Sequence, residues 1–255
     1  MARAAPTATS VGVGEGRSPR GDGATDAPTR RRGDYPCLMT SPDIEASLLS
    51  LGASTLDDLL ADVAGKSPAP GGGAVVSAVA ALAAALGNMV VSYSAGKKSL
   101  ADHDQLHADA AAELHRAAAI LVELADEDAI AYAHLNRLQR LDADDPARAD
   151  LASAALAATT VPLAVAAAAA DVLRVFERLV NASNPWLRSD LAIATIFAGA
   201  AVRAARWNVS INLPSLVEAG VPQEHADDLL GAATDMMEAA ERRAQAIEEA
   251  CRAGW

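Results

Sequence analysis

One carboxylate, Asp128, interrupts a stripe of apolar residues that repeats at the helical period. At 100° per residue, Asp128 shares a helical face with a set of apolar and aromatic side chains. These are Ala117, Leu121, Leu124, Ala125, Ala131, Tyr132 and Leu135. Burial raises the pKa of a carboxyl group and lets it exchange protons near neutral pH. The pattern therefore makes Asp128 a candidate general acid or base.

The neighbouring acids differ from Asp128 in the face they occupy. Asp126 and Glu127 fall on other sides of the helix, where we expect them to be solvated. Asp128 itself has a second, structural interpretation, as a buried acid paired with an arginine or with a hydroxyl such as that of Tyr132. Periodicity alone does not separate the two interpretations.

A pair of histidines gives a second chemical pattern. His103 and His107, with Asp104 between them, have the i, i+4 spacing of a zinc-protease helix. A third ligand is not evident and the flanking residues are polar. The pattern favours a solvated helical face over a metal site.

The segment Ser67–Gly96 contains no Asp, Glu, Lys, Arg or His. We therefore expect the rest of the chain to pack against it. Two prolines and the glycines Gly71–Gly73 predict a tight turn before a helix that begins near Ala74. Lys97 and Lys98 follow this helix. They either complement the helix dipole or bind an anion.

A helix without charges is either a membrane span or the core of a helical protein. Alanine dominates the segment 74–95, and several polar residues interrupt it: Ser77, Asn88, Ser92 and Ser94. Transfer of such a segment into lipid would release little free energy. We therefore expect a buried central helix rather than a membrane span.

Further helices are expected along the rest of the chain. Pro146 opens one that contains the uncharged run Leu151–Ala170, which Pro162 should kink. The other predicted helices cover 55–65, Ser99–Leu141, Ser189–Trp207 and Gln223–Arg252. Strand formers never gather into alternating runs, which indicates an all-α fold.

Cap residues predict two helix starts and one helix end. Ser54 with Asp57 resembles a capping box, and Ser189 is a plausible N-cap that puts Asp190 in the first turn. The helix that starts there is expected to end at Trp207, ahead of Asn208, Asn212 and Pro214. Asparagines at a helix end are usually caps or turn residues, and less often bind the edge of a heterocycle.

Composition limits the function classes. The chain has 255 residues, of which 51% are hydrophobic and 3% aromatic, enough for one domain with a large core. The net charge is −12. Such an acidic protein does not favour nucleic acid as a partner.

The N-terminal part differs from the rest of the chain. Residues 1–40 are rich in glycine, proline and arginine, and predict a disordered tail before a helical domain at 41–255. The tail has no apolar stretch typical of a signal peptide. The two cysteines, Cys37 and Cys251, give neither a disulfide framework nor a metal cluster. A cytoplasmic location is the expectation.

Six short motifs occur in one order along the chain: SPAPGGG, AGKK, LADEDAIAY, TTVPL, SDLAIA and WNVSINL. Together they resemble the cyclodeaminase/cyclohydrolase family over about Thr55–Leu216. The family includes the C-terminal domain of formiminotransferase-cyclodeaminase and bacterial methenyltetrahydrofolate cyclohydrolase. The resemblance implies an all-α, orthogonal or up-down bundle that forms homodimers and acts on tetrahydrofolate derivatives. It also implies no metal or other cofactor. The net charge and the alanine-rich composition add the expectations of no nucleic acid and no membrane as partners.

The resemblance assigns roles to individual positions. The second aspartate of the family's D-x-D-A-x-A-[FY] pattern falls on Asp128, which implies catalysis by this side chain. The glycine turn resembles the family's folate-site loop, and the lysine pair matches one that could meet the glutamate tail. The positions that the resemblance implicates in substrate binding are Gly71, Gly72, Gly73, Lys97, Lys98, Asp190, Asn208 and Asn212.

Two activities fit these positions. A formimidoyltetrahydrofolate cyclodeaminase and a methenyltetrahydrofolate cyclohydrolase both need proton transfer at the N5/N10 one-carbon bridge, which one carboxylate can perform. The alternative is a helical oligomerisation scaffold that keeps the fold without catalysis. A scaffold would have no need for Asp128 beside a glycine turn and a basic pair.

Overall fold

The computed structural model describes residues 50–67 and 69–253. Its long helices are α3 (Gly72–Ser92), α4 (Asp104–Gln139), α5 (Leu151–Leu179), α6 (Arg188–Glu218) and α7 (Gln223–Arg252). Shorter elements are η1 (Leu51–Ala53), α2 (Leu56–Ala64), η2 (Lys98–His103), η3 (Pro146–Asp150) and η4 (Pro185–Leu187). The described residues form no strand, so the predicted all-α fold is confirmed. The predicted tail at 1–40 lies outside the described part.

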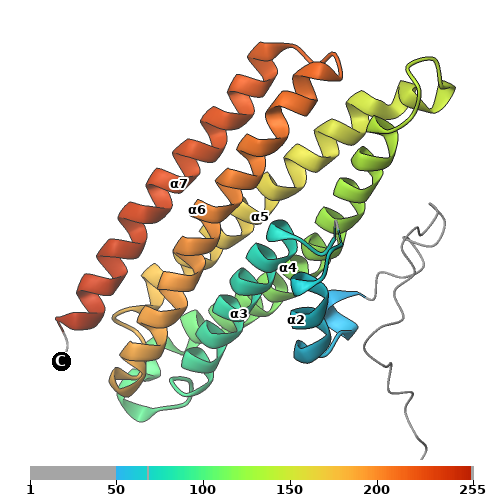
Figure 1. Ribbon diagram of the computed structural model, residues 1–255. Coiled ribbons are helices and arrows are strands. Elements are labelled where there is room, and N and C mark those ends of the chain that lie inside the picture. Colours follow the sequence, from blue (N-terminus) through green and yellow to red (C-terminus); the bar gives the residue numbers. More distant parts are fainter. Residues whose placement is uncertain (1–49, 68, 254–255) are drawn as a thin grey trace, which may run out of the picture. The chain divides into compact units, whose positions relative to one another are not determined.

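The long helices form an up-down bundle, because short connections make successive helices antiparallel neighbours (Figure 1). Each of α3 to α6 packs against the next, and α3 also packs against α6, which closes the bundle. Helix α7 packs against α5 and α6. The Ala-rich helix α3 is thus one of four core helices, and it contacts the other three.

Small residues let these helices approach closely. Ala80, Ala83 and Ala84 of α3 are fully buried. At Gly87 a Cβ atom would overlap the ring of Phe176 on α5, so this position has no room even for alanine. A core built in this way needs few aromatic residues to reach the packing density of a protein interior.

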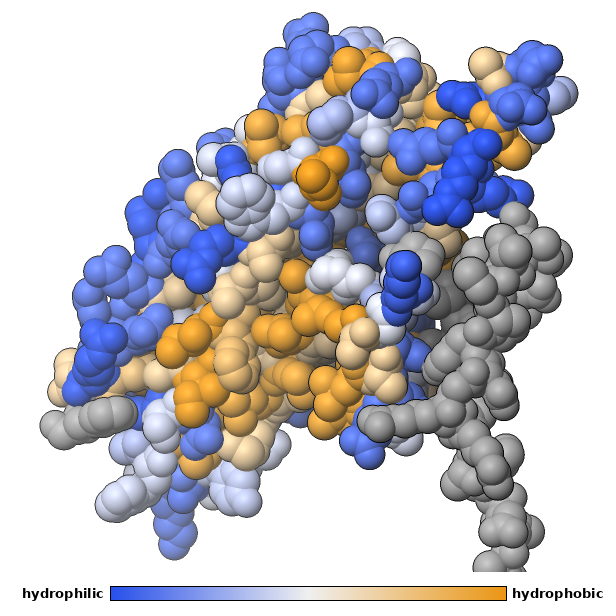
Figure 2. Space-filling view, in the orientation of Figure 1, coloured by the Kyte–Doolittle hydropathy of each residue, from blue (hydrophilic) through white to orange (hydrophobic). Residues whose placement is uncertain are grey.

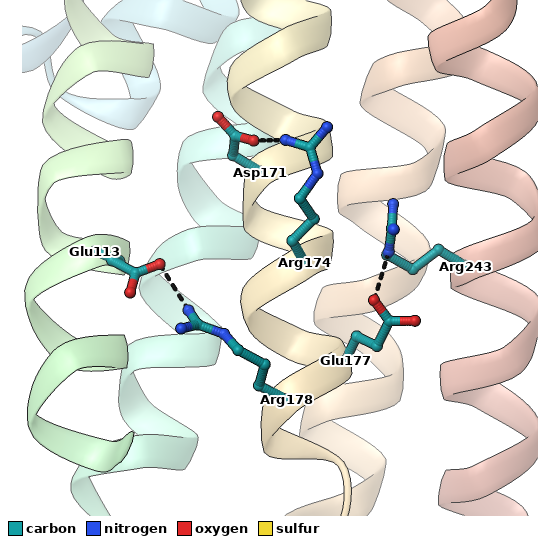
Figure 3. Close-up of polar contacts among 6 residues, drawn as sticks. All are labelled: Glu113, Asp171, Arg174, Glu177, Arg178 and Arg243. Atoms are coloured by element: carbon teal, nitrogen blue, oxygen red, sulfur yellow. Dashed lines mark hydrogen bonds and ion pairs between the residues drawn. The ribbon is translucent and has the colours of Figure 1, made fainter. Parts of the chain in front are cut away.

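Ion pairs tie the outer surfaces of neighbouring helices together (Figure 3). Arg178 of α5 contacts Glu113 of α4, with 2.6 Å between Nη2 and Oε2. Arg243 of α7 contacts Glu177 of α5, with 2.7 Å between Nε and Oε2. Partly exposed pairs of this kind contribute little stability, about 1 kcal/mol or less each. The buried apolar contacts therefore dominate the energetics of the bundle.

One exposed surface is strongly apolar. Figure 2 shows apolar side chains gathered over the region where Figure 1 places α3 and α6. The large exposed residues of these two helices include Val75, Leu82, Ile193, Ile196 and Phe197. We call these five residues the α3–α6 apolar face. A patch of this kind is typical of an interaction surface.

Two segments, Gly72–Ser92 and Pro146–Leu179, are long and apolar enough to cross a membrane by length and composition alone. Core helices of water-soluble proteins pass the same test. Both segments pack against several other helices of the bundle. Their composition is therefore accounted for by helix packing.

Two predicted helix starts are wrong by one or two residues. The capping box is formed by Thr55 and Asp58, not by Ser54 and Asp57. Helix α6 begins at Arg188 after Leu187, without the predicted side-chain cap from Ser189. Leu187 is the last residue of the short helix η4, which leads directly into α6 and leaves no turn for a serine cap.

The predicted end of α6 at Trp207 is wrong by about three turns. The helix continues through Pro214 to Glu218. Proline stops a helix only when the lost hydrogen bond and the steric conflict are not offset by packing. Leu216, beyond the proline, is fully buried among residues of α4, α5 and α7, and this packing carries the helix onward.

Candidate active site

A pocket lies where the N-terminus of α3 meets the middle of α4 and the C-terminal half of α6. Its lining residues are Ala69, Gly71, Gly72, Gly73, Asp128, Ala129, Tyr132, Asn208, Ile211 and Asn212. The cavity volume is about 170 Å³. This is less than the few hundred Å³ of pockets that enclose a whole drug-sized ligand. The pocket therefore suits the reacting end of a larger molecule.

The glycine turn forms one wall. Gly71 is the N-cap of α3 in extended conformation, and the first helical hydrogen bond of this turn runs from Val75 N to Gly71 O, at 3.2 Å. The N–H groups of Gly72 and Gly73 precede this bond and so have no acceptor within the helix. They give the pocket wall hydrogen-bond donors and the positive end of a helix dipole.

Gly73 is required because the carboxyl group of Asp128 lies against its Cα. A Cβ atom at position 73 would overlap all three atoms of that carboxyl group. The first turn of α3 and the middle of α4 are fixed by the bundle, so a Cβ atom at position 73 would force the carboxyl group to rotate away from its present place. The absence of a side chain at Gly73 thus sets the place of the Asp128 carboxylate.

Burial perturbs Asp128. Desolvation raises the pKa of its carboxyl group to about 6. The side chain has no hydrogen bond or ion pair with any of the residues that the structure describes, including Tyr132. The structural interpretation, an acid paired with an arginine or with Tyr132, is therefore wrong. A desolvated carboxylate without a partner that lines a pocket is able to exchange protons with a ligand.

The two asparagines lie one turn apart within α6, where they share a helical face, and not at its end. Asn208 has no hydrogen-bond partner in the described part of the chain. Its Oδ1 would lie 3.6 Å from a Cβ atom at Gly72. Asn212 donates from Nδ2 to the carbonyl oxygen of Ala158 on α5, at 2.6 Å. The pocket thus has two side-chain amide groups. That of Asn212 is hydrogen-bonded to α5, and that of Asn208 has no hydrogen-bond partner among the described residues.

Six of the nine predicted site residues line this pocket, and three do not. Lys97 and Lys98 follow the C-terminal end of α3, whereas the glycine turn is at its N-terminus. A helix of 21 residues is about 30 Å long, so the lysines lie far from Asp128. Asp190 is in the first turn of α6, at the end of that helix remote from Asn208.

Sequence reasoning missed three pocket residues, Ala69, Ala129 and Ile211, and saw Tyr132 only as a possible partner of Asp128. Ile211 lies three residues after Asn208, so the two share a helical face. This shared face was missed because the predicted helix ended at Trp207. Asp126 was also misjudged. It is half-buried and accepts hydrogen bonds from Ser50 Oγ at 2.6 Å and from Leu51 N at 2.7 Å.

The prediction of a solvated face is wrong for His107. This side chain is 1% exposed, and its Nε2 lies 2.7 Å from the carbonyl oxygen of Ala182. His103 is near it, with 6.3 Å between the ring centroids. Among the residues that the structure describes, no three potential metal ligands lie together. His107 thus joins α4 to the loop after α5.

Known proteins resemble this chain in sequence. A family model described as formiminotransferase-cyclodeaminase matches residues 55–231. The formimidoyltransferase-cyclodeaminase of Mus musculus is 32% identical over 186 residues, which cover 71% of this chain and 34% of the mouse protein. The chain thus spans about a third of the length of such relatives. The methenyltetrahydrofolate cyclohydrolase of Methylorubrum extorquens is 30% identical over 189 residues, which cover 71% of this chain and 89% of that protein.

A solved structure shares the fold. The crystal structure of formiminotetrahydrofolate cyclodeaminase from Thermotoga maritima aligns with a TM-score of 0.72 at 25% sequence identity. The alignment covers 79% of this chain and 98% of the Thermotoga chain. The similarity therefore extends over nearly all of that protein.

Proposed function

We propose that this chain, which belongs to the formiminotransferase-cyclodeaminase family, is an enzyme that acts on a one-carbon derivative of tetrahydrofolate. The reaction takes place in the pocket at the glycine turn, and Asp128 is the general acid and base. One observation carries the mechanism. The carboxylate of Asp128 lines this pocket without a hydrogen-bond partner among the described residues, and burial raises its pKa to about 6.

In the cyclodeaminase reaction, N10 of the folate attacks the formimino carbon on N5. Asp128 in its carboxylate form accepts the proton that N10 loses. The formimino group reacts in its protonated amidinium form, so the attack leaves an –NH2 group on the carbon. Asp128 then gives the proton from N10 to this –NH2 group, so that its C–N bond breaks, ammonia leaves and the methenyl cation forms. A carboxyl group with a pKa of about 6 can both accept and return a proton at neutral pH.

In the cyclohydrolase reaction, water adds to the carbon that bridges N5 and N10. Asp128 accepts a proton from this water and returns it to N5 as the bond between N5 and the carbon breaks. The remaining hydroxyl proton leaves to solvent as the formyl C=O bond forms, so the reaction releases one proton overall. The product is the 10-formyl compound. Positioned proton transfer of this kind contributes about 10²- to 10⁴-fold to a rate. Both reactions use residues of the pocket and call for no metal or organic cofactor.

The remaining predicted site residues are assigned to substrate binding. The glycine turn and the two asparagines offer hydrogen bonds to the reacting end of the folate. Lys97 and Lys98, about 30 Å away along α3, are too distant to contact that end. We assign them to the anionic tail of a folate that carries several glutamates, which can span this distance. Asp190 keeps a proposed binding role at a similar distance from the pocket.

We also propose that the chain acts as a homodimer through the α3–α6 apolar face. Ile211 is 74% exposed, continues the apolar surface of α6 and lines the pocket. A second copy seated on this face would therefore also cover the mouth of the pocket. It would enlarge a cavity that is too small for the whole ligand and remove water from around Asp128.

The test is to supply the purified protein with methenyltetrahydrofolate or formimino-tetrahydrofolate and to follow the methenyl absorbance band. Loss of the band faster than in buffer indicates a cyclohydrolase. Appearance of the band from the formimino compound indicates a cyclodeaminase. No change above background with either compound would overturn the enzyme proposal and favour the non-catalytic scaffold.

A further inference from the structure

Pro162 lies inside α5 and leaves one backbone carbonyl without its helical partner. Proline has no N–H, so the carbonyl oxygen four residues earlier cannot receive the usual hydrogen bond. In α5 this is the carbonyl of Ala158. Ala158 is buried, where an unpaired carbonyl oxygen would be costly.

Asn212 of α6 supplies the missing donor. Its Nδ2 lies 2.6 Å from the carbonyl oxygen of Ala158. A carbonyl oxygen can only accept, so the nitrogen of the amide, and not its oxygen, must face α5. The side chain of Asn212 therefore has one orientation, which the proline of the neighbouring helix dictates.

The same contact leaves the oxygen of Asn212 available. The amide group is planar, so Oδ1 points away from the Ala158 carbonyl. This oxygen accepts no hydrogen bond within the described part of the chain, and it is not among the buried polar atoms without a partner. It is thus open to solvent, on a residue that lines the pocket with Asp128.

We propose that Asn212 is a substrate-binding residue whose Oδ1 accepts a hydrogen bond from an N–H group of the substrate, and that Pro162 holds it in this orientation. The proposal rests on the proposed function and assigns it a specific contact. Both one-carbon folates carry N–H groups. An amide oxygen accepts a hydrogen bond at every pH, so it can hold an N–H group while Asp128 gains and loses its proton.

The experiment is a mutant cycle of four proteins: the wild type, Asn212→Ala, Pro162→Ala and the double variant Pro162→Ala/Asn212→Ala. Alanine at 162 supplies a backbone N–H that can donate to the carbonyl oxygen of Ala158. This carbonyl then no longer needs Asn212 as its donor. For each protein the melting temperature, kcat and KM are measured with the folate that the wild type converts. The effect of Asn212→Ala is compared within each background.

Asn212→Ala alone should lower the melting temperature and should lower kcat/KM by roughly three- to tenfold, the worth of one hydrogen bond. In the Pro162→Ala background, the melting temperature should no longer respond to Asn212→Ala. The fall in kcat/KM should remain but become smaller, because Pro162 no longer holds the Asn212 amide in one orientation. A purely structural asparagine would give no fall in kcat/KM in that background, and this result would overturn the proposal.

The cycle also separates this inference from the proposed function. If the wild type converts a folate and the double variant matches Pro162→Ala in kcat/KM, only the role of Asn212 is overturned. If the wild type converts neither folate, the proposed function fails, and the proposed substrate contact fails with it. The melting temperatures test the Asn212–Ala158 hydrogen bond in either case.

Discussion

At the scale of single residues, Asp128 combines a chemical role with a cost in stability. Its carboxyl pKa is raised from 3.8 to about 6 because burial removes water from the charged form. Between these pH values the folded protein binds the proton more tightly than the unfolded chain does. Stability from this group is therefore present at low pH, declines as pH rises from about 4 to 6, and stays reduced above that.

The first prediction follows from the direction of this pH dependence. Asp128→Asn removes the ionised form, so the variant should be more stable than the wild type at pH 8, by up to about 3 kcal/mol for a shift of this size. Near pH 3.5 the two proteins should be equally stable. Urea unfolding at both pH values measures the difference, and a gain that does not change with pH would contradict the desolvation of Asp128.

The second prediction concerns Gly73. Gly73→Ala should lower kcat/KM as severely as loss of Asp128, because the new Cβ displaces the carboxyl group. The matched control is Gly231→Ala on α7, where a Cβ would meet nothing within 4 Å. The control should keep full activity and gain up to about 1 kcal/mol from helix propensity. Full activity of Gly73→Ala would show that catalysis does not depend on the present position of the Asp128 carboxyl group.

At the scale of helices, α3 depends on glycine in its middle as well as at its start. Gly87→Ala should destabilise the bundle by about 1–3 kcal/mol, although alanine is the better helix former, because the Cβ would overlap the ring of Phe176. Thermal unfolding beside Gly231→Ala isolates the packing effect. Equal stability of the two variants would mean that α3 and α5 can move apart freely.

The helices also show what the sequence could predict. Periodicity indicated the all-α fold and singled out Asp128, because both depend on local spacing along one helix. The shared face of Asn208 and Asn212 was missed, because Pro214 looked like a helix stop while the buried Leu216 keeps α6 going. The burial of His107 depends on Ala182, 75 residues away, and no local pattern contains that contact.

At the scale of the whole molecule, the α3–α6 apolar face predicts the assembly. Ile196→Asp should turn a dimer into a monomer, because it places a charge in the proposed interface. Ile120→Asp on α4 is the matched control, since Ile120 and Ile196 are both 48% exposed. Light scattering after size-exclusion chromatography measures the mass. A wild type that is monomeric at micromolar concentration would contradict the proposed dimer.

The most direct test of the proposed mechanism is the pH dependence of kcat/KM for the wild type and Asp128→Asn, followed by methenyl absorbance. The carboxylate must first accept a proton, so the wild-type value should rise as pH increases through about 6 and then level off. Asp128→Asn should lose about 10²- to 10⁴-fold and show no such rise. A variant that keeps wild-type activity with the same pH profile would contradict Asp128 as the group that transfers the proton.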